Sequence, residues 1–160
     1  LLTHFSWMVI NLNASGNIVK PVGDPPSAQV NKAHSEGVKF IIFVSDFVSN
    51  PEVMMDNFLY SSTAMDNFAN NLLNYIQTHN ADGVNFDFEN INNTNANDSQ
   101  PNAPKVVTFA QKIWNKLHPA GYHISYSTPY TEQNQFLAPV FDLSALHPYL
   151  DVFTIMTYPY

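Results

Sequence analysis

The chain lacks cysteine and arginine, and it has few charged residues of either sign. Without cysteine, its 160 residues can form no disulfide and carry no thiol chemistry. All six basic residues are lysines and the net charge is −7. Contacts to phosphate need clustered Lys or Arg side chains, so an acidic chain without arginine is poorly suited to nucleic acid. We therefore expect no nucleic-acid partner.

Long apolar runs are also missing. No stretch approaches the ~20 apolar residues that a membrane-spanning helix needs, so we expect no membrane partner. Hydrophobic residues are nevertheless abundant at 45%, and aromatic residues reach 14%, whereas only 12% of residues are charged. This composition is typical of a globular domain, because disordered chains combine low hydrophobicity with high charge. The length suits a single domain, to which we assign residues 1–160.

Strand and helix patterns alternate along the chain. Period-two or continuous apolar runs predict strands at 5–12, 38–45, 84–89, 123–128 and 152–158. Apolar stripes at helical spacing predict helices at 27–35, 62–79 and 104–117, with a short helical turn at 143–147. The connections are too long for hairpins and suit right-handed crossovers between parallel strands. The pattern therefore indicates an α/β fold.

Two α/β architectures fit this alternation, a doubly wound sheet and a (β/α)8 TIM barrel. A dinucleotide-binding doubly wound sheet would carry a glycine-rich phosphate loop after its first strand, and the chain has none there. Polar residues also gather near the carboxyl ends of several predicted strands, which is the catalytic face of a barrel. We therefore predict a barrel. A complete one needs about 250 residues, so this chain would supply roughly strands two to six of a longer protein.

The segment Asp82–Glu89 carries the strongest functional signal. Its polar and apolar residues alternate, so three apolar side chains share one face of the predicted strand and three polar side chains the other: Val84, Phe86 and Phe88 against Asn85, Asp87 and Glu89. Burying unpaired carboxylates costs several kcal/mol, so an acidic stripe in a covered strand needs partners or a purpose. The purpose we favour is a general acid at the carboxyl end of the strand.

Other interpretations of this segment remain. The alternation also suits an antiparallel strand with one wet face, with Asp82-Gly83 as a hairpin turn. A cation site would need more carboxylates in a less linear arrangement, and the six histidines show no paired spacing, so we expect no metal and no cofactor. In the favoured interpretation Asp82 caps the turn into the strand, and Gly83 serves backbone conformation.

The same segment resembles the signature strand of family 18 glycoside hydrolases, the chitinase family. That signature is Asp-Gly-x-Asp-x-Asp-x-Glu on the fourth strand of a (β/α)8 barrel. Asp82, Gly83, Asp87 and Glu89 match it, and Asn85 replaces the middle Asp, as in the chitobiase-like branch of the family. Residues 3–12 and 38–42 are similar to the family's second and third strands, and residues 156–158 resemble its sixth-strand motif Met-x-Tyr-Asp.

The resemblance implies a substrate-assisted, retaining hydrolysis of β-1,4-linked N-acetylglucosamine oligomers. Glu89 would protonate the glycosidic oxygen, and the substrate's own N-acetyl carbonyl oxygen would attack the anomeric carbon. Asp87 would orient the acetamido group and raise the pKa of Glu89, while Asn85 would donate a hydrogen bond to Asp87. Tyr158 would donate to the acetamido oxygen. The implied catalytic residues are thus Glu89, Asp87 and Tyr158.

Asn85, Met156 and Tyr126 are the implied substrate-binding residues, and a carbohydrate is the expected partner. The expected location is secreted, or lysosomal or vacuolar. Two departures from the family pattern keep other functions open. The third strand ends in Ser45–Phe47 instead of Ser-x-Gly-Gly, and Pro159 stands where the sixth-strand motif has Asp. The alternatives are a chitinase-like lectin without turnover, and an unrelated α/β barrel with a different reaction.

Overall fold

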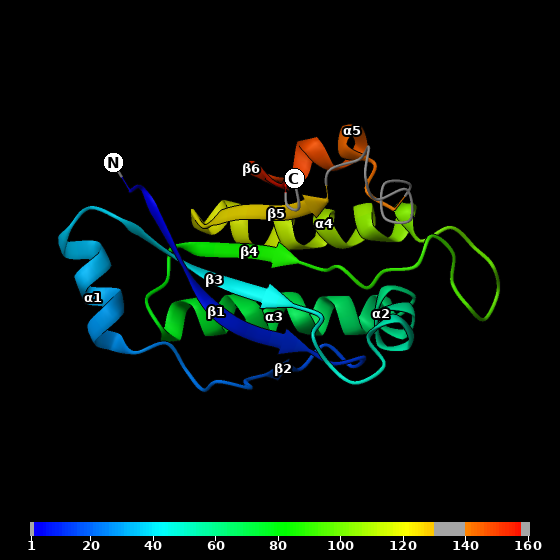
Figure 1. Cartoon of the computed structure of the whole chain (residues 1–160), viewed down its shortest axis with the longest axis horizontal. Coiled ribbons are helices and arrows are strands. Elements are labelled where there is room, and N and C mark those ends of the chain that lie inside the picture. Colours follow the sequence, from blue (N-terminus) through cyan, green and yellow to red (C-terminus); the bar gives the residue numbers. More distant parts are fainter. Residues whose placement is uncertain (1, 130–139, 158–160) are drawn as a thin grey trace.

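The computed structural model describes residues 2–129 and 140–157 (Figure 1). Their strands form one sheet in the order β2-β1-β3-β4-β5-β6. The bounds are β1 His4–Leu12, β2 Ile18–Val19, β3 Lys39–Ser45, β4 Gly83–Asp87, β5 His123–Pro129 and β6 Val152–Met156. All neighbouring pairs are parallel except β1 with β2, a short antiparallel hairpin at the edge. The parallel strands follow one another in chain order without the reversal of a doubly wound sheet, as barrel strands do.

The helices connect these parallel strands. They are α1 Ser27–Ser35, α2 Pro51–Leu59, α3 Ser62–Thr78, α4 Ala103–Leu117 and the short α5 Leu143–Leu146. The predicted strands and helices are present, with small shifts at their ends. Helix α2 was not predicted; Pro51 lies in its first turn, and Met54, Met55, Phe58 and Leu59 are buried. No described helix is long and apolar enough to cross a bilayer.

An aromatic core joins β4 to the helices behind the sheet. In Figure 1, α3 and α4 lie along the far face of the sheet. The Phe86 ring of β4 contacts Phe109 of α4 at 5.2 Å between centroids and Phe68 of α3 at 6.4 Å. Phe58 of α2 joins them edge-on, at 5.6 Å from Phe109. Each such buried side chain contributes roughly 1.5–3 kcal/mol, so these contacts fix which face of β4 is covered by helices.

Two carboxylates repeat one arrangement at the amino ends of the strands. Asp82, just before β4, accepts the backbone N–H of Phe40 in β3 at 2.7 Å and donates its own N–H to the Phe40 carbonyl at 2.8 Å. Asp151, just before β6, does the same with Ile124 of β5, at 2.8 Å for both bonds. Asp82 also contacts His34 of α1 at 2.8 Å. The expected structural role of Asp82 fits these contacts.

Gly83 serves close packing rather than an unusual backbone conformation, which corrects our expectation. It is not among the glycines with positive φ. A Cβ atom at this position would lie 2.2 Å from the carbonyl oxygen of His123, which no side chain can tolerate without movement of β5. Gly83 therefore allows β4 and β5 to approach at the start of both strands.

Candidate active site

A row of polar side chains crosses the sheet near the carboxyl ends of three strands. The register pairs Asn11 of β1 with Ser45 of β3, and Ser45 with Asp87 of β4. All three side chains are buried. Asn11 donates from Nδ2 to the carbonyl oxygen of Phe47 at 2.8 Å, which holds the turn after β3 in place. The row lies at the end of the sheet where barrel enzymes carry out their chemistry.

Asn85 lies on the same face of β4 as Asp87, opposite the helix-facing phenylalanines. Its Oδ1 accepts a hydrogen bond from the Ser125 hydroxyl at 2.9 Å, and its Nδ2 donates to the Ser127 Oγ at 2.9 Å. The expected hydrogen bond from Asn85 to Asp87 is therefore wrong, because both serines of β5 take up the amide. Ser125 and Ser127 were missed in the sequence, although their alternation along β5 marks them as one face.

Asp87 is the most perturbed acid of the site. It is 6% exposed, and one carboxylate oxygen, Oδ1, is buried without a hydrogen-bond partner among the described residues. Burial raises the pKa of Asp87 to about 7, helped by the negative charges of Glu89 and Asp46 and by a hydrogen bond with Glu89. Asp87 and Glu89 therefore form a close carboxyl pair, in which Asp87 keeps its proton to a higher pH than an isolated carboxyl does.

Glu89 lies beyond the end of its strand. The predicted strand ran to Glu89, but β4 ends at Asp87 because its pairing with β3 stops at Ser45. The backbone N–H of Glu89 instead donates to the Asp46 carboxylate at 3.3 Å. The next residue, Asn90, donates to the same carboxylate from its backbone at 2.8 Å and from Nδ2 at 3.0 Å.

Asp46 is the site residue that the sequence analysis missed. It directly follows β3 and is completely buried, and burial raises its pKa against the lowering effect of hydrogen bonds from Asn90, Glu89 and its own backbone N–H. In the sequence it stood only as a departure from the family's third-strand turn. Its partners lie 43 and 44 residues further along the chain, so no local pattern predicts the contact.

The remaining predicted site residues have different positions. Tyr126 is a correction: it pairs in register with Phe86, faces the helices and is completely buried, with its ring 5.4 Å from that of Phe141. A residue without exposed surface in this position belongs to the core rather than to a sugar-binding surface. Met156 is the half-buried last residue of β6, beside Pro129 in register. Tyr158 lies outside the described residues.

Buried polar atoms without partners gather near the same end of the sheet. Within residues 2–129 and 140–157, such atoms occur on Asn11, Asp87, Tyr126 and Thr128, all from strands, and on Asn102 at the start of α4. The atoms on Tyr126 and Thr128 lie on the face of the sheet that the helices cover, whereas those on Asn11 and Asp87 lie on the polar face. Because buried polar groups in proteins are nearly always hydrogen-bonded, the latter two indicate a place where water or a polar ligand binds. In the same described part, no group of three or more His, Asp or Glu side chains is arranged to hold a metal ion.

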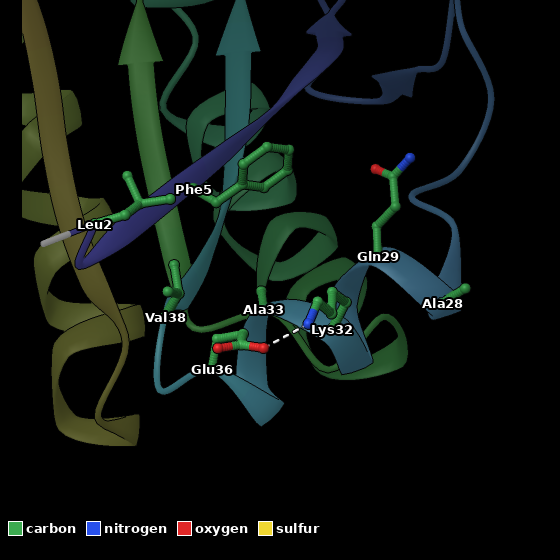
Figure 2. Close-up of a pocket in the computed structure, with 8 residues that line it drawn as sticks. All are labelled: Leu2, Phe5, Ala28, Gln29, Lys32, Ala33, Glu36 and Val38. Carbon is green, nitrogen blue, oxygen red and sulfur yellow. Dashed lines mark hydrogen bonds and ion pairs between the residues drawn. The ribbon is translucent and has the colours of Figure 1, made fainter.

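A cavity of about 670 Å³ lies away from these acids, at the opposite end of the strands (Figure 2). It is lined by Leu2 and Phe5 near the start of β1, by Val38 before β3, and by one side of α1. Lys32 and Glu36 form an ion pair beside it. The cavity is mainly apolar, and its two charged side chains, Lys32 and Glu36, are paired with each other, so we place the candidate active site at the carboxyl ends of the strands instead.

Comparison with known families decides the relationship. The family model for glycosyl hydrolases family 18 matches residues 23–160. The chain belongs to this family. Sequence comparison with curated proteins finds no match. The family assignment confirms the resemblance seen in Asp82–Glu89, whereas the chitobiase-like branch stays a prediction.

Solved structures agree on the fold. The spore cortex-lytic enzyme SleL of Bacillus megaterium has a TM-score of 0.84 at 18% identity, over 99% of this chain and 36% of that one. A chitinase of Chromobacterium violaceum has a TM-score of 0.80 at 20% identity, over 98% and 48%. A group IV chitinase of Ostrinia furnacalis has a TM-score of 0.78 at 17% identity, over 98% and 43%. The predicted fold class, part of a family 18 barrel, is confirmed, and the chain spans at most about half of these structures.

Proposed function

We propose that the complete protein is a glycoside hydrolase that cleaves β-1,4-linked N-acetylglucosamine oligomers. The observation that carries the proposal is the carboxyl pair of Asp87 and Glu89 at the carboxyl end of a central strand, with the pKa of Asp87 raised to about 7. Structural ion pairs stabilise a fold, but two carboxyls that repel each other need a functional reason. The family membership supports a glycosidase, and residues 1–160 form part of its catalytic barrel in this proposal.

The reaction follows the substrate-assisted retaining scheme. The proton that Asp87 holds passes to Glu89 through their hydrogen bond, which leaves Asp87 negative, and Glu89 donates a proton to the glycosidic oxygen as the bond to the anomeric carbon breaks. The substrate's acetamido carbonyl oxygen bonds to that carbon and gives an oxazolinium ion. Glu89 then takes a proton from water, whose oxygen attacks the anomeric carbon. This attack opens the oxazolinium ring and restores the original configuration at that carbon.

Asp87 acts on the acetamido group in this scheme. Its buried Oδ1, which has no partner in the described part of the chain, is available to accept the acetamido N–H. That hydrogen bond aligns the carbonyl oxygen for attack, and the nearby negative charge stabilises the oxazolinium ion. Tyr158 as a donor to the acetamido oxygen, and Met156 and Asn85 as substrate-binding residues, remain predictions of this proposal.

The test compares a chito-oligosaccharide with its fully de-N-acetylated counterpart on the complete protein. Substrate assistance requires the acetamido carbonyl, so only the acetylated form should be cleaved. Equal cleavage of both would rule out the mechanism. Binding of the acetylated form without any cleavage would favour the lectin alternative, which Pro159 in place of the usual Asp keeps open.

A further inference from the structure

The Asp46 carboxylate connects the ends of two neighbouring strands. It is completely buried and accepts three hydrogen bonds, all from two consecutive residues that follow β4. The Glu89 N–H and the Asn90 side chain share Oδ1, and the Asn90 N–H occupies Oδ2. A buried carboxylate is tolerated when N–H groups surround it, and here those groups come from Glu89 and Asn90.

The backbone at Glu89 is held by these bonds because the sheet does not reach it. The β3–β4 ladder ends with the pair Ser45–Asp87. Just beyond this pair, the Asp46 side chain replaces the backbone carbonyls of β3 as the acceptor for the N–H groups that follow β4. The orientation of Glu89 toward Asp87 therefore depends on a side chain from the neighbouring strand.

Asp56 is a matched control for Asp46, because it also binds the segment between β4 and α4. It lies in α2, is also buried, and accepts the Ala96 N–H at 2.9 Å and the Asn102 side-chain amide at 2.8 Å. Both aspartates thus anchor the segment between β4 and α4 through buried hydrogen bonds. Asp46 binds it beside Glu89, whereas Asp56 binds it seven or more residues further along.

We propose that Asp46 is a positioning residue that fixes the Glu89–Asn90 backbone and so aims the Glu89 carboxyl at the scissile bond. The inference rests on the proposed function for its kinetic consequences. Asp46 does not touch substrate in this assignment, and it acts through Glu89. Its negative charge also contributes to the raised pKa of Asp87, so it links the geometry of the site to its protonation.

The kinetic test compares Asp46→Asn with Asp56→Asn in the complete protein on a chito-oligosaccharide. In Asp46→Asn the new side-chain NH2 group would face the N–H donors of Glu89 and Asn90, so the Glu89–Asn90 backbone would no longer be held. We therefore expect kcat to fall about 10- to 100-fold while KM stays within about twofold. The part of the pH–activity profile that reflects the titration of Asp87 should move to lower pH, because the charge of Asp46 no longer raises the pKa of Asp87. Asp56→Asn should keep kcat within about twofold and leave the pH profile in place.

Asn90→Ala separates geometry from charge. It removes one of the three hydrogen bonds and leaves the Asp46 charge intact, so kcat should fall less than in Asp46→Asn and the pH profile should not move. Equal kcat in wild type and Asp46→Asn, or equal losses in Asp46→Asn and Asp56→Asn, would overturn the proposal.

Hydrogen exchange supplies a readout that needs no turnover. The amides of Glu89 and Asn90 should exchange about tenfold faster or more in Asp46→Asn, while that of Ala96 stays protected. Asp56→Asn should show the reverse. Unchanged exchange at Glu89 and Asn90 overturns the positioning role whatever the activity. An inactive wild type with the expected exchange pattern would instead overturn the proposed function and leave the anchoring by Asp46 supported.

Discussion

Acidic side chains occur at both ends of the parallel strands, but their surroundings differ between the two ends. At the amino ends, Asp82 and Asp151 each accept a backbone N–H of the adjoining strand and lie near a histidine, His34 and His123 respectively. At the carboxyl ends, burial raises the pKa of both Asp46 and Asp87, and the negative charges of Glu89 and Asp46 raise that of Asp87 further. Acids matched by donors stabilise a fold, whereas acids that repel each other reduce its stability.

The difference assigns separate tasks to the two ends. The amino end joins strands through repeated carboxylate-to-backbone bonds and the close approach at Gly83. The carboxyl end gathers unpartnered polar atoms and a carboxyl pair. Substitutions at the amino end should therefore change stability, and those at the carboxyl end should change turnover.

The largest effect is expected for Glu89→Gln in the complete protein. Loss of the general acid should lower turnover of a chito-oligosaccharide about 10²-fold or more, while the free energy of unfolding should not fall, because the substitution relieves the repulsion between Asp87 and Glu89. Glu36→Gln is the control, because Glu36 is exposed at the end of α1 and far from the acids. Similar turnover losses in both variants would show that substitutions at the carboxyl end affect turnover no more than substitutions elsewhere.

Asp87→Asn should change both turnover and the pH dependence of stability. The folded-state pKa of Asp87 is about 7 against an ordinary 3.8, so the folded protein binds more protons between these values. The free energy of unfolding should therefore fall as pH rises from about 4 to about 7, and this slope should be smaller in Asp87→Asn. Urea unfolding at several pH values measures it. Parallel pH curves for both proteins would contradict the raised pKa.

Gly83→Ala should lower the free energy of unfolding by about 1–3 kcal/mol, because the added methyl group meets the His123 carbonyl. Gly121→Ala is a useful comparison. Its Cβ would meet no atom within 4 Å, but its φ is +85°, so it reports the backbone penalty alone, roughly 1 kcal/mol. A smaller loss for Gly83→Ala than for Gly121→Ala would show that β4 and β5 can separate easily.

The smallest effects are expected for Asp82→Ala and Asp151→Ala. Each leaves one backbone N–H of the neighbouring strand without its acceptor, so each should lower the free energy of unfolding by about 1 kcal/mol. Turnover at a temperature where the variants stay folded should be unchanged. A loss of turnover in either variant would contradict the expectation that side chains at the amino ends of the strands affect stability alone.

The alternation in Asp82–Glu89 was sufficient to predict which side chains of β4 face the helices and which face the polar row. The burial of Tyr126 was also accessible, since Ser125 and Ser127 alternate with it along β5. The Asp46 contacts were not, because they join residues more than 40 positions apart through the ends of two strands. Helix α2 was missed although the sequence carries its signals: Pro51 lies in its first turn, and the buried Met54, Met55, Phe58 and Leu59 recur at helical spacing.

The most direct test of the difference between the ends is an NMR titration of the Asp87 carboxyl in the complete protein. We predict an apparent pKa of about 7 in the wild type, and a lower value in Glu89→Gln and in Asp46→Asn, because each substitution removes a neighbouring negative charge. An Asp87 pKa near 4 in the wild type, unaffected by either substitution, would contradict the crowding of acids on which the account rests.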